Sequence, residues 1–143
     1  MCISFYWGAP IGYVEQMRYL GVWFVSGRKF TVDFSPAKKK FARVVNAIFA
    51  KTGTRASESV VLHLIRAQAL PCLLYGCEAL DPNRSVCHSL DFLFYRFIFK
   101  LFRTNSRVLV DEVLLRCGVA IPSVEIGCRR SRFLHRRNCQ QVQ

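Results

Sequence analysis

The sequence contains no Cys-x-x-Cys pair, although it has seven cysteines. The odd count and the wide spacing argue against a disulfide framework and against a zinc site. The three histidines lie far from any close pair of cysteines, so we do not expect them to bind a metal. Reduced thiols are typical of an intracellular protein, with nucleus and cytoplasm both open.

Signatures of enzymes are missing as well. The sequence has no Gly-x-Gly-x-x-Gly, no P-loop and no Gly-x-Ser-x-Gly motif. The adjacent acids Asp111 and Glu112 would point in different directions on a helix, so we interpret them as solvated rather than catalytic. No uncharged run reaches the roughly 18 residues of a membrane span, which predicts no transmembrane segment.

Acidic residues are few: 9, against 21 Lys and Arg, which gives a formal net charge of +12. At 52% hydrophobic, with twelve Phe, the 143 residues can bury a core and are too apolar to be disordered throughout. A folded and strongly basic chain favours an anionic partner, nucleic acid first and an anionic membrane surface second. A basic protein without such a partner is the alternative.

We expect the segment from Ser57 to Leu80 to form the centre of the core. Ser57 can cap a helix, and Glu58 suits its N-terminal end. The apolar residues that follow recur at helical spacing and predict one buried stripe: Val61, Leu64, Ile65 and Ala69. Pro71 lacks a backbone donor and clashes with the preceding turn, so we predict a kinked or broken helix.

Short strands are expected in the N-terminal part. The segment Tyr19–Val25 is rich in β-branched and aromatic residues and is predicted to be a strand. Residues 26–29 are typical of a turn. Phe30, Val32 and Phe34 then alternate with polar residues, which predicts a half-buried strand and a hairpin. A sheet of about three strands would be marginal by itself.

The other helices are expected to begin at a capping residue or a proline, with Ser35, Asp81 and Ser106 as caps. Their expected spans are 35–53, 81–103, 106–118 and from 121 onward. The predicted fold class is α+β, mainly α, with a small N-terminal β-sheet or hairpin followed by a bundle of about four to five helices. The expected divisions are a strand region at 1–34, a helical domain at 35–137 and a tail at 138–143.

Basic residues gather on the polar sides of these helices. In the first helix an apolar stripe faces one way and basic residues the other, at about 100° per residue. The candidate nucleic-acid-binding residues are Lys39, Lys40, Arg43, Arg96, Lys100, Arg103, Arg129 and Arg130. We interpret them as phosphate contacts. Ordinary solvation is the alternative, and the last two could belong to a frayed basic tail.

Three aromatic residues are expected to point away from the main apolar face of the helix over 81–103: Phe92, Tyr95 and Phe99. A helix that is apolar nearly all round is usually buried on both sides. These side chains therefore predict a missing partner surface, or self-association through them.

Four stretches carry a pattern: Arg18–Val22 (RYLGV), a basic helix ending in Lys51–Gly53, Leu70–Leu80 (LPCLLYGCEAL) and Arg96–Thr104 (RFIFKLFRT). In this order they resemble the C-terminal part of reverse transcriptases, RNA-directed DNA polymerases, encoded by LINE-type (non-long-terminal-repeat) retrotransposons. The resemblance covers roughly residues 10–137. The YLG and LLYG-x-E elements, at this separation, are its most specific parts.

The resemblance implies that the YLG stretch ends a palm domain and that the helices form a thumb, which holds the template–primer duplex. It also implies that the basic residues face RNA, DNA or an RNA–DNA hybrid. The family holds magnesium through three aspartates, two of them adjacent, that precede the YLG stretch. Here no Asp-Asp pair occurs, and Glu15 is the only acid before Arg18. The chain alone is therefore expected to be an inactive, truncated fragment without a cofactor.

Two other functions stay open. One is a structural or interaction module, or a relic reading frame with no nucleic-acid role, which the uncovered aromatic residues favour. The other is a basic peripheral-membrane protein. Its basic residues, however, are spread over several helices rather than one amphipathic face.

Overall fold

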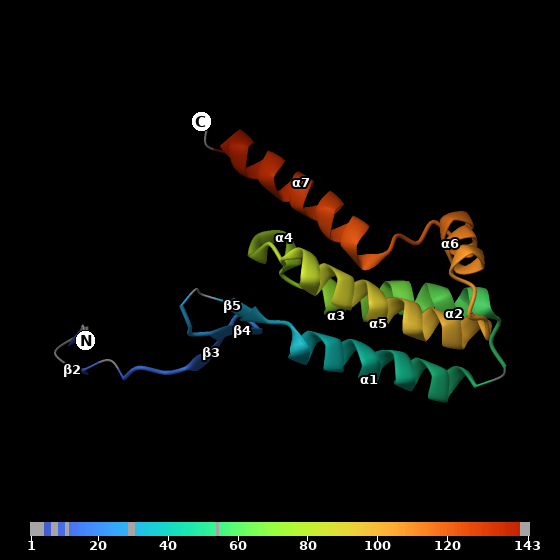
Figure 1. Cartoon of the computed structure of the whole chain (residues 1–143), viewed down its shortest axis with the longest axis horizontal. Coiled ribbons are helices and arrows are strands. Elements are labelled where there is room, and N and C mark those ends of the chain that lie inside the picture. The colour runs from blue at the N-terminus through green and yellow to red at the C-terminus, as the bar shows by residue number, and fades with distance from the viewer. Residues whose placement is uncertain (1–4, 7–8, 11, 29–30, 54, 141–143) are drawn as a thin grey trace. The chain divides into compact units, whose positions relative to one another are not determined.

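The computed structural model describes residues 5–6, 9–10, 12–28, 31–53 and 55–140 (Figure 1). The chain divides into two compact units, Met1–Asp33 and Phe34–Gln143. Antiparallel strands make up the first unit and helices the second, so the predicted mainly α, α+β class is confirmed.

The described part of the N-terminal unit contains two small antiparallel sheets. Strands β1 (Phe5–Tyr6) and β2 (Ala9–Pro10) pair with each other. The second sheet has the order β3-β4-β5, formed by β3 (Gln16–Tyr19), β4 (Val22–Val25) and β5 (Thr31–Asp33). No residue of β3, β4 or β5 is fully buried, which agrees with the marginal stability expected of so small a sheet.

The YLG stretch is a turn, so the single strand predicted over Tyr19–Val25 is wrong. Tyr19 pairs with Val22, and Leu20 and Gly21 between them have φ of 47° and 83°. A two-residue hairpin turn with both central residues at positive φ matches the twist of its strands. Gly21 adopts that conformation easily, whereas Leu20 does so at a cost. The predicted β4–β5 hairpin forms, but part of its turn lies outside the described residues.

Helix α1 (Ser35–Thr52) opens the helical unit. Phe34 is its N-cap and is buried, so it does not belong to a strand as predicted. Ser35 lies one position inside the helix, and the N-cap residue Phe34 makes no side-chain capping hydrogen bond. Gly53, at φ 52°, ends the helix as expected.

The segment predicted to kink or break at Pro71 is helical on both sides of it, with a change of helix type just before the proline. Helix α2 (Glu58–Leu64) passes into a π-helical segment, η1 (Ile65–Ala69), and then into α3 (Leu70–Leu74). The wider π turn comes just before Pro71. In a regular α-helix a backbone carbonyl of this turn would clash with the proline ring. The break comes later, at Gly76 (φ 75°), before the short helix α4 (Cys77–Leu80). The expected Ser57 cap also fails to form, since its hydroxyl meets that of Ser59 at 3.0 Å.

Helix α5 (Arg84–Phe102) packs against α1 through aromatic side chains. Phe97 meets Phe41 edge-on, with ring centroids 5.7 Å apart, and Phe49 at 6.4 Å. Lys38 of α1 donates a hydrogen bond of 2.6 Å from Nζ to Ser89 of α5. Both helices run in the same direction through the unit (Figure 1).

The cap predicted at Asp81 is wrong. The side chain of Asn83 accepts a 2.9 Å hydrogen bond from the backbone N–H of Val86 and begins α5. Asp81 instead has a left-handed backbone and forms an ion pair with Arg130 of α7. The predicted end of α5 at Arg103 is confirmed.

Helices α6 (Arg107–Arg116) and α7 (Pro122–Gln140) complete the unit. Ser106 caps α6 as predicted, through a 3.5 Å bond from the N–H of Leu109. Gly118, at φ 62°, lets the N–H of Val119 reach back to the carbonyl of Leu114 at 2.9 Å. Helix α7 runs to Gln140, so residues 138–140 are helical rather than part of the expected tail.

Asp91 joins α7 to α5. Its Oδ1 accepts a 2.8 Å hydrogen bond from the backbone N–H of Ser123, in the first turn of α7. This N–H has no partner within its own helix, and a carboxylate also suits the positive end of the helix dipole. A side chain distant in sequence thus performs the capping that α7 needs.

By length and composition, residues Glu58–Leu80 could cross a membrane, with 44% of the apolar window buried in the unit. A core helix has the same composition. The most buried side chains of the segment include Ile65, Leu73 and Leu74. They lie in the core, where η1 and α3 contact α1 and α3 also contacts α7. We therefore describe the segment as the core of the helical unit.

Replacing Asp91 tests its role as a long-range cap. Asp91→Ala is expected to lower the free energy of unfolding by about 1–2 kcal/mol, because it leaves the N–H of Ser123 unpaired. Asp91→Asn keeps an acceptor and should lose less than half as much. Chemical denaturation of the purified chain measures both. Equal stability of the Ala variant and the wild type would contradict the assignment.

The structure also predicts which cysteine is protected. Burial, and then the charge of Glu78, raises the pKa of the Cys77 thiol to about 12, and its side chain is 0% exposed. Cys117 and Cys128 are exposed. Because the thiolate is the reactive form, iodoacetamide at pH 8 should label Cys117 and Cys128 well before Cys77, as mapped by peptide mass spectrometry. Labelling in denaturant is the control, and equal rates in the native protein would refute the prediction.

Candidate nucleic-acid interface

The basic face of α1 is the first part of the candidate interface. Phe41, Val45 and Ile48 are buried, so the residues that lie opposite them on the helix are solvent-exposed. These exposed residues, which we call the α1 basic face, are Lys39, Lys40, Arg43, Asn46, Ala47, Ala50 and Lys51. The three cations predicted from the sequence therefore share one face. Helical spacing from Lys39 also identifies Lys51, which the prediction did not include.

Among the described residues, no acidic side chain pairs with this face. The sequence has no Asp or Glu between Asp33 and Glu58. Within residues 31–53 and 55–140, Lys39, Lys40 and Arg43 form no ion pair or hydrogen bond through their side chains. The positive charge of the face is thus available to an external anion.

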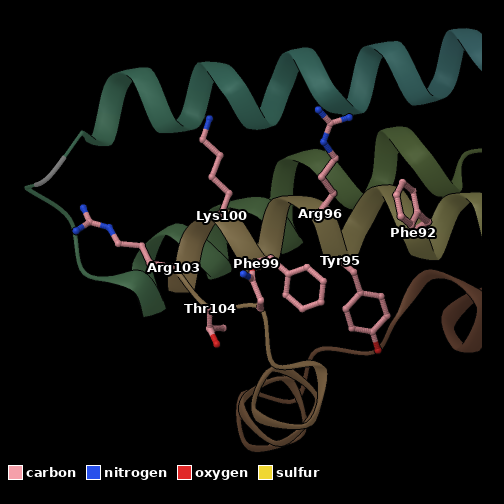
Figure 2. Close-up of a pocket in the computed structure, with 8 residues that line it drawn as sticks. Phe92, Tyr95, Arg96, Phe99, Lys100, Arg103 and Thr104 are labelled. Carbon is pink, nitrogen blue, oxygen red and sulfur yellow. The ribbon is translucent and has the colours of Figure 1, made fainter.

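A second basic row lies on α5. Arg96, Lys100 and Arg103 are all exposed. Figure 2 shows Arg96 and Lys100 directed from α5 toward α1. The ammonium of Lys100 lies 5.3 Å from the centroid of the Phe49 ring on α1, a distance at which a cation is attracted to an aromatic face. The α5 row therefore places Arg96 and Lys100 beside α1.

An open groove of about 420 Å³ runs along this row (Figure 2). Three aromatic and three basic side chains line it: Phe92, Tyr95, Phe99, Arg96, Lys100 and Arg103. The ring of Phe92 is 72% exposed. Tyr95, in contrast, is only 7% exposed, and Phe99 is half-buried. The prediction that all three aromatic residues are uncovered is therefore wrong for Tyr95.

Tyr95 is covered because α6 meets it with two charged residues. Its hydroxyl donates a hydrogen bond to Asp111, and the guanidinium of Arg107 lies 4.7 Å from its ring centroid. Burial raises the pKa of Tyr95, and the hydrogen bond to Asp111 raises it further. The phenol therefore stays protonated and remains a donor. Sequence reasoning missed this contact because it depends on where α6 docks.

The two candidate residues on α7, Arg129 and Arg130, are in a different state. Arg129 Nε lies 2.8 Å from the carboxylate of Glu125, and Arg130 forms its ion pair with Asp81. Both side chains are half-buried. Their charges are already compensated within the unit, which separates them from the cations of α1 and α5.

A buried carboxyl oxygen lies near these pairs. Oε2 of Glu78 is buried and has no hydrogen-bond partner among the described residues. Its neighbour Cys77 is protonated at neutral pH, as its raised pKa requires. Within the described part of the chain, no group of three or more His, Cys, Asp or Glu side chains could hold a metal ion. Glu78 is therefore a polar feature of the core without a ligand set around it.

Comparisons with known proteins identify no relative of this chain. No family model, no curated protein and no solved structure matches this chain. The basic surface is therefore assigned from its charge and geometry, and the resemblance to LINE-type reverse transcriptases stays a prediction.

Removing the Tyr95 hydroxyl tests whether its hydrogen bond to Asp111 holds α6 against α5. Tyr95→Phe should lower the free energy of unfolding by about 1 kcal/mol, because Asp111 loses a hydrogen bond while the ring stays in place. The matched control is Tyr19→Phe, an exposed tyrosine at 58%, which is expected to change stability by less than about 0.5 kcal/mol. Thermal and chemical unfolding measure both, and equal effects would show that α6 is not held by this contact.

Proposed function

We propose that the helical unit binds the phosphate backbone of nucleic acid without sequence preference, as a thumb-like fragment of LINE-type reverse transcriptase origin. The observation that carries this proposal is the α1 basic face, where Lys39, Lys40 and Arg43 are exposed and no carboxylate of the described residues pairs with them. Unpaired cations on a rigid helix gain free energy by displacing the counterions of a polyanion.

The length of the face suits a phosphate backbone. From Lys39 to Lys51 the helix rises about 18 Å, at about 1.5 Å per residue. A duplex carries one negative charge per roughly 1.7 Å of its axis, so several phosphates come within reach of the face. Ala47 and Ala50 lie exposed between the cations, and their small side chains leave room for close approach.

The α5 row extends this surface. Arg96 and Lys100 are directed from α5 toward α1 (Figure 2), so they add positive charge beside the helix that carries the α1 basic face. Contacts of this type position a nucleic acid but read no bases. The proposal is therefore limited to binding, and it assigns no step of DNA synthesis to this chain.

The salt dependence of binding tests the proposal. The full chain should bind a labelled RNA–DNA hybrid with an affinity that falls steeply between about 50 and 200 mM salt, as followed by fluorescence anisotropy. Exchanging Lys39, Lys40 and Arg43 for Gln should reduce the slope of log K against log salt by about 2 to 3, since each phosphate contact contributes about 0.9. A flat response of the wild type would refute the proposal.

A matched control removes the same charge elsewhere. Arg116, Arg129 and Arg130 each pair with a carboxylate, so their exchange for Gln should change the slope by less than about 1. Thermal unfolding of both triple variants checks that they remain folded. Equal losses from the two sets would mean that net charge, rather than the α1 basic face, determines binding.

A further inference from the structure

The exposed side of α5 alternates aromatic and basic residues. Phe92, Arg96, Phe99 and Arg103 follow one another at spacings of four, three and four residues, which places them in one row along the helix. Lys100 flanks the row on the α1 side (Figure 2). The groove beside them, at about 420 Å³, falls within the roughly 300–1,000 Å³ range of small-molecule sites.

The rings that form the groove are held in place before anything binds. The centroids of Tyr95 and Phe99 are 5.8 Å apart, with 33° between the ring planes. Tyr95 is in turn fixed by Arg107 and Asp111 of α6. Phe92 differs, because most of its ring meets solvent. A ligand that covers Phe92 therefore finds a preorganised floor, which lowers the entropy that binding costs.

The charges of the groove select the kind of ligand. Arg96, Lys100 and Arg103 line it, and no acidic residue is among the described side chains that do. An exposed aromatic ring favours a flat partner, and the cations favour an anion spaced a few ångströms from it. Unpaired nucleotides combine both features, whereas in a duplex the bases are stacked on one another and cannot reach an aromatic side chain.

We propose that this groove binds an unpaired nucleotide of a single-stranded nucleic acid, with the base against Phe92, one phosphate at Arg96 and a later phosphate of the same strand at Arg103. Alternating aromatic and basic residues are how proteins hold single strands without reading their sequence. The inference rests on the proposed function and extends it from a duplex backbone to an unpaired nucleotide, and it depends on Phe92, which the duplex test leaves unchanged.

The test compares two single-stranded probes of equal length and charge, an oligo-dT and a fully abasic strand. The full chain should bind the oligo-dT about tenfold more tightly, within the range known for a base stacked on an aromatic side chain. Phe92→Ala should abolish this preference and leave the salt slope unchanged, while Phe92→Trp should retain it. Leu115→Ala, an 81% exposed residue of α6, is the control and should change neither quantity.

Three outcomes would overturn the proposal. Equal affinity for the two probes would show that no base is held. Retention of the full base preference by Phe92→Ala, with thermal unfolding unchanged, would show that the base does not lie on Phe92. Concentration-dependent self-association that Phe92→Ala removes, without any base preference, would assign the groove to a second copy of the chain.

Further measurements distinguish a single strand from free nucleotides, and this inference from the proposed function. Competition by thymidine monophosphate as strong as that by the oligo-dT would assign the groove to free nucleotides and overturn the single-strand proposal. Duplex binding that depends on the α1 basic face, with no base preference, would refute this inference alone. Absence of binding to every probe would refute both this inference and the proposed function.

Discussion

The contact between Phe97 and helix α1 is the constraint on which the helical unit depends. Phe97 meets both Phe41 and Phe49, and it thereby decides which side of α1 is buried. Successive side chains of a helix turn by about 100°, so burial of Phe41 directs Lys39 and Arg43 outward. The same contact brings Phe49 under the ammonium of Lys100. The basic surface is thus a consequence of how the core packs.

Helix α5 is apolar nearly all round, and two polar contacts explain how its second side is covered. Tyr95 holds α6 through Asp111, and Asp91 holds the start of α7 through the backbone of Ser123. Each contact satisfies groups that would otherwise lose their hydrogen bonds on burial. Neither neighbouring helix covers Phe92, which therefore stays exposed beside the cations of the row. The groove exists because α6 and α7 are fixed where they are.

Features set by local spacing could be predicted from the sequence, whereas those set by tertiary contacts could not. The buried side of α1, its end at Gly53 and the Ser106 cap follow from helical periodicity and from the chemistry of single residues. The backbone around Pro71 could not be predicted in this way. The sequence predicts a kink or a break there, but not that a π-helical segment accommodates the proline ring. Burial of Tyr95 likewise required knowing where α6 docks. The proposed site was therefore predictable as a set of basic residues, but its aromatic component was only partly so.

Ion pairing divides the cations of this chain into two classes that the net charge of +12 does not reveal. Arg129 and Arg130 carry the same charge as Arg43, yet carboxylates already compensate them, and binding a phosphate there would mean breaking an existing pair. At exposed sites such ion pairs stabilise the fold by up to about 1 kcal/mol. A phosphate that breaks one loses that free energy from its own binding. On the α1 basic face no such pair exists among the described residues, so that cost is absent. A polyanion should therefore engage α1 and the α5 row before Arg129 and Arg130.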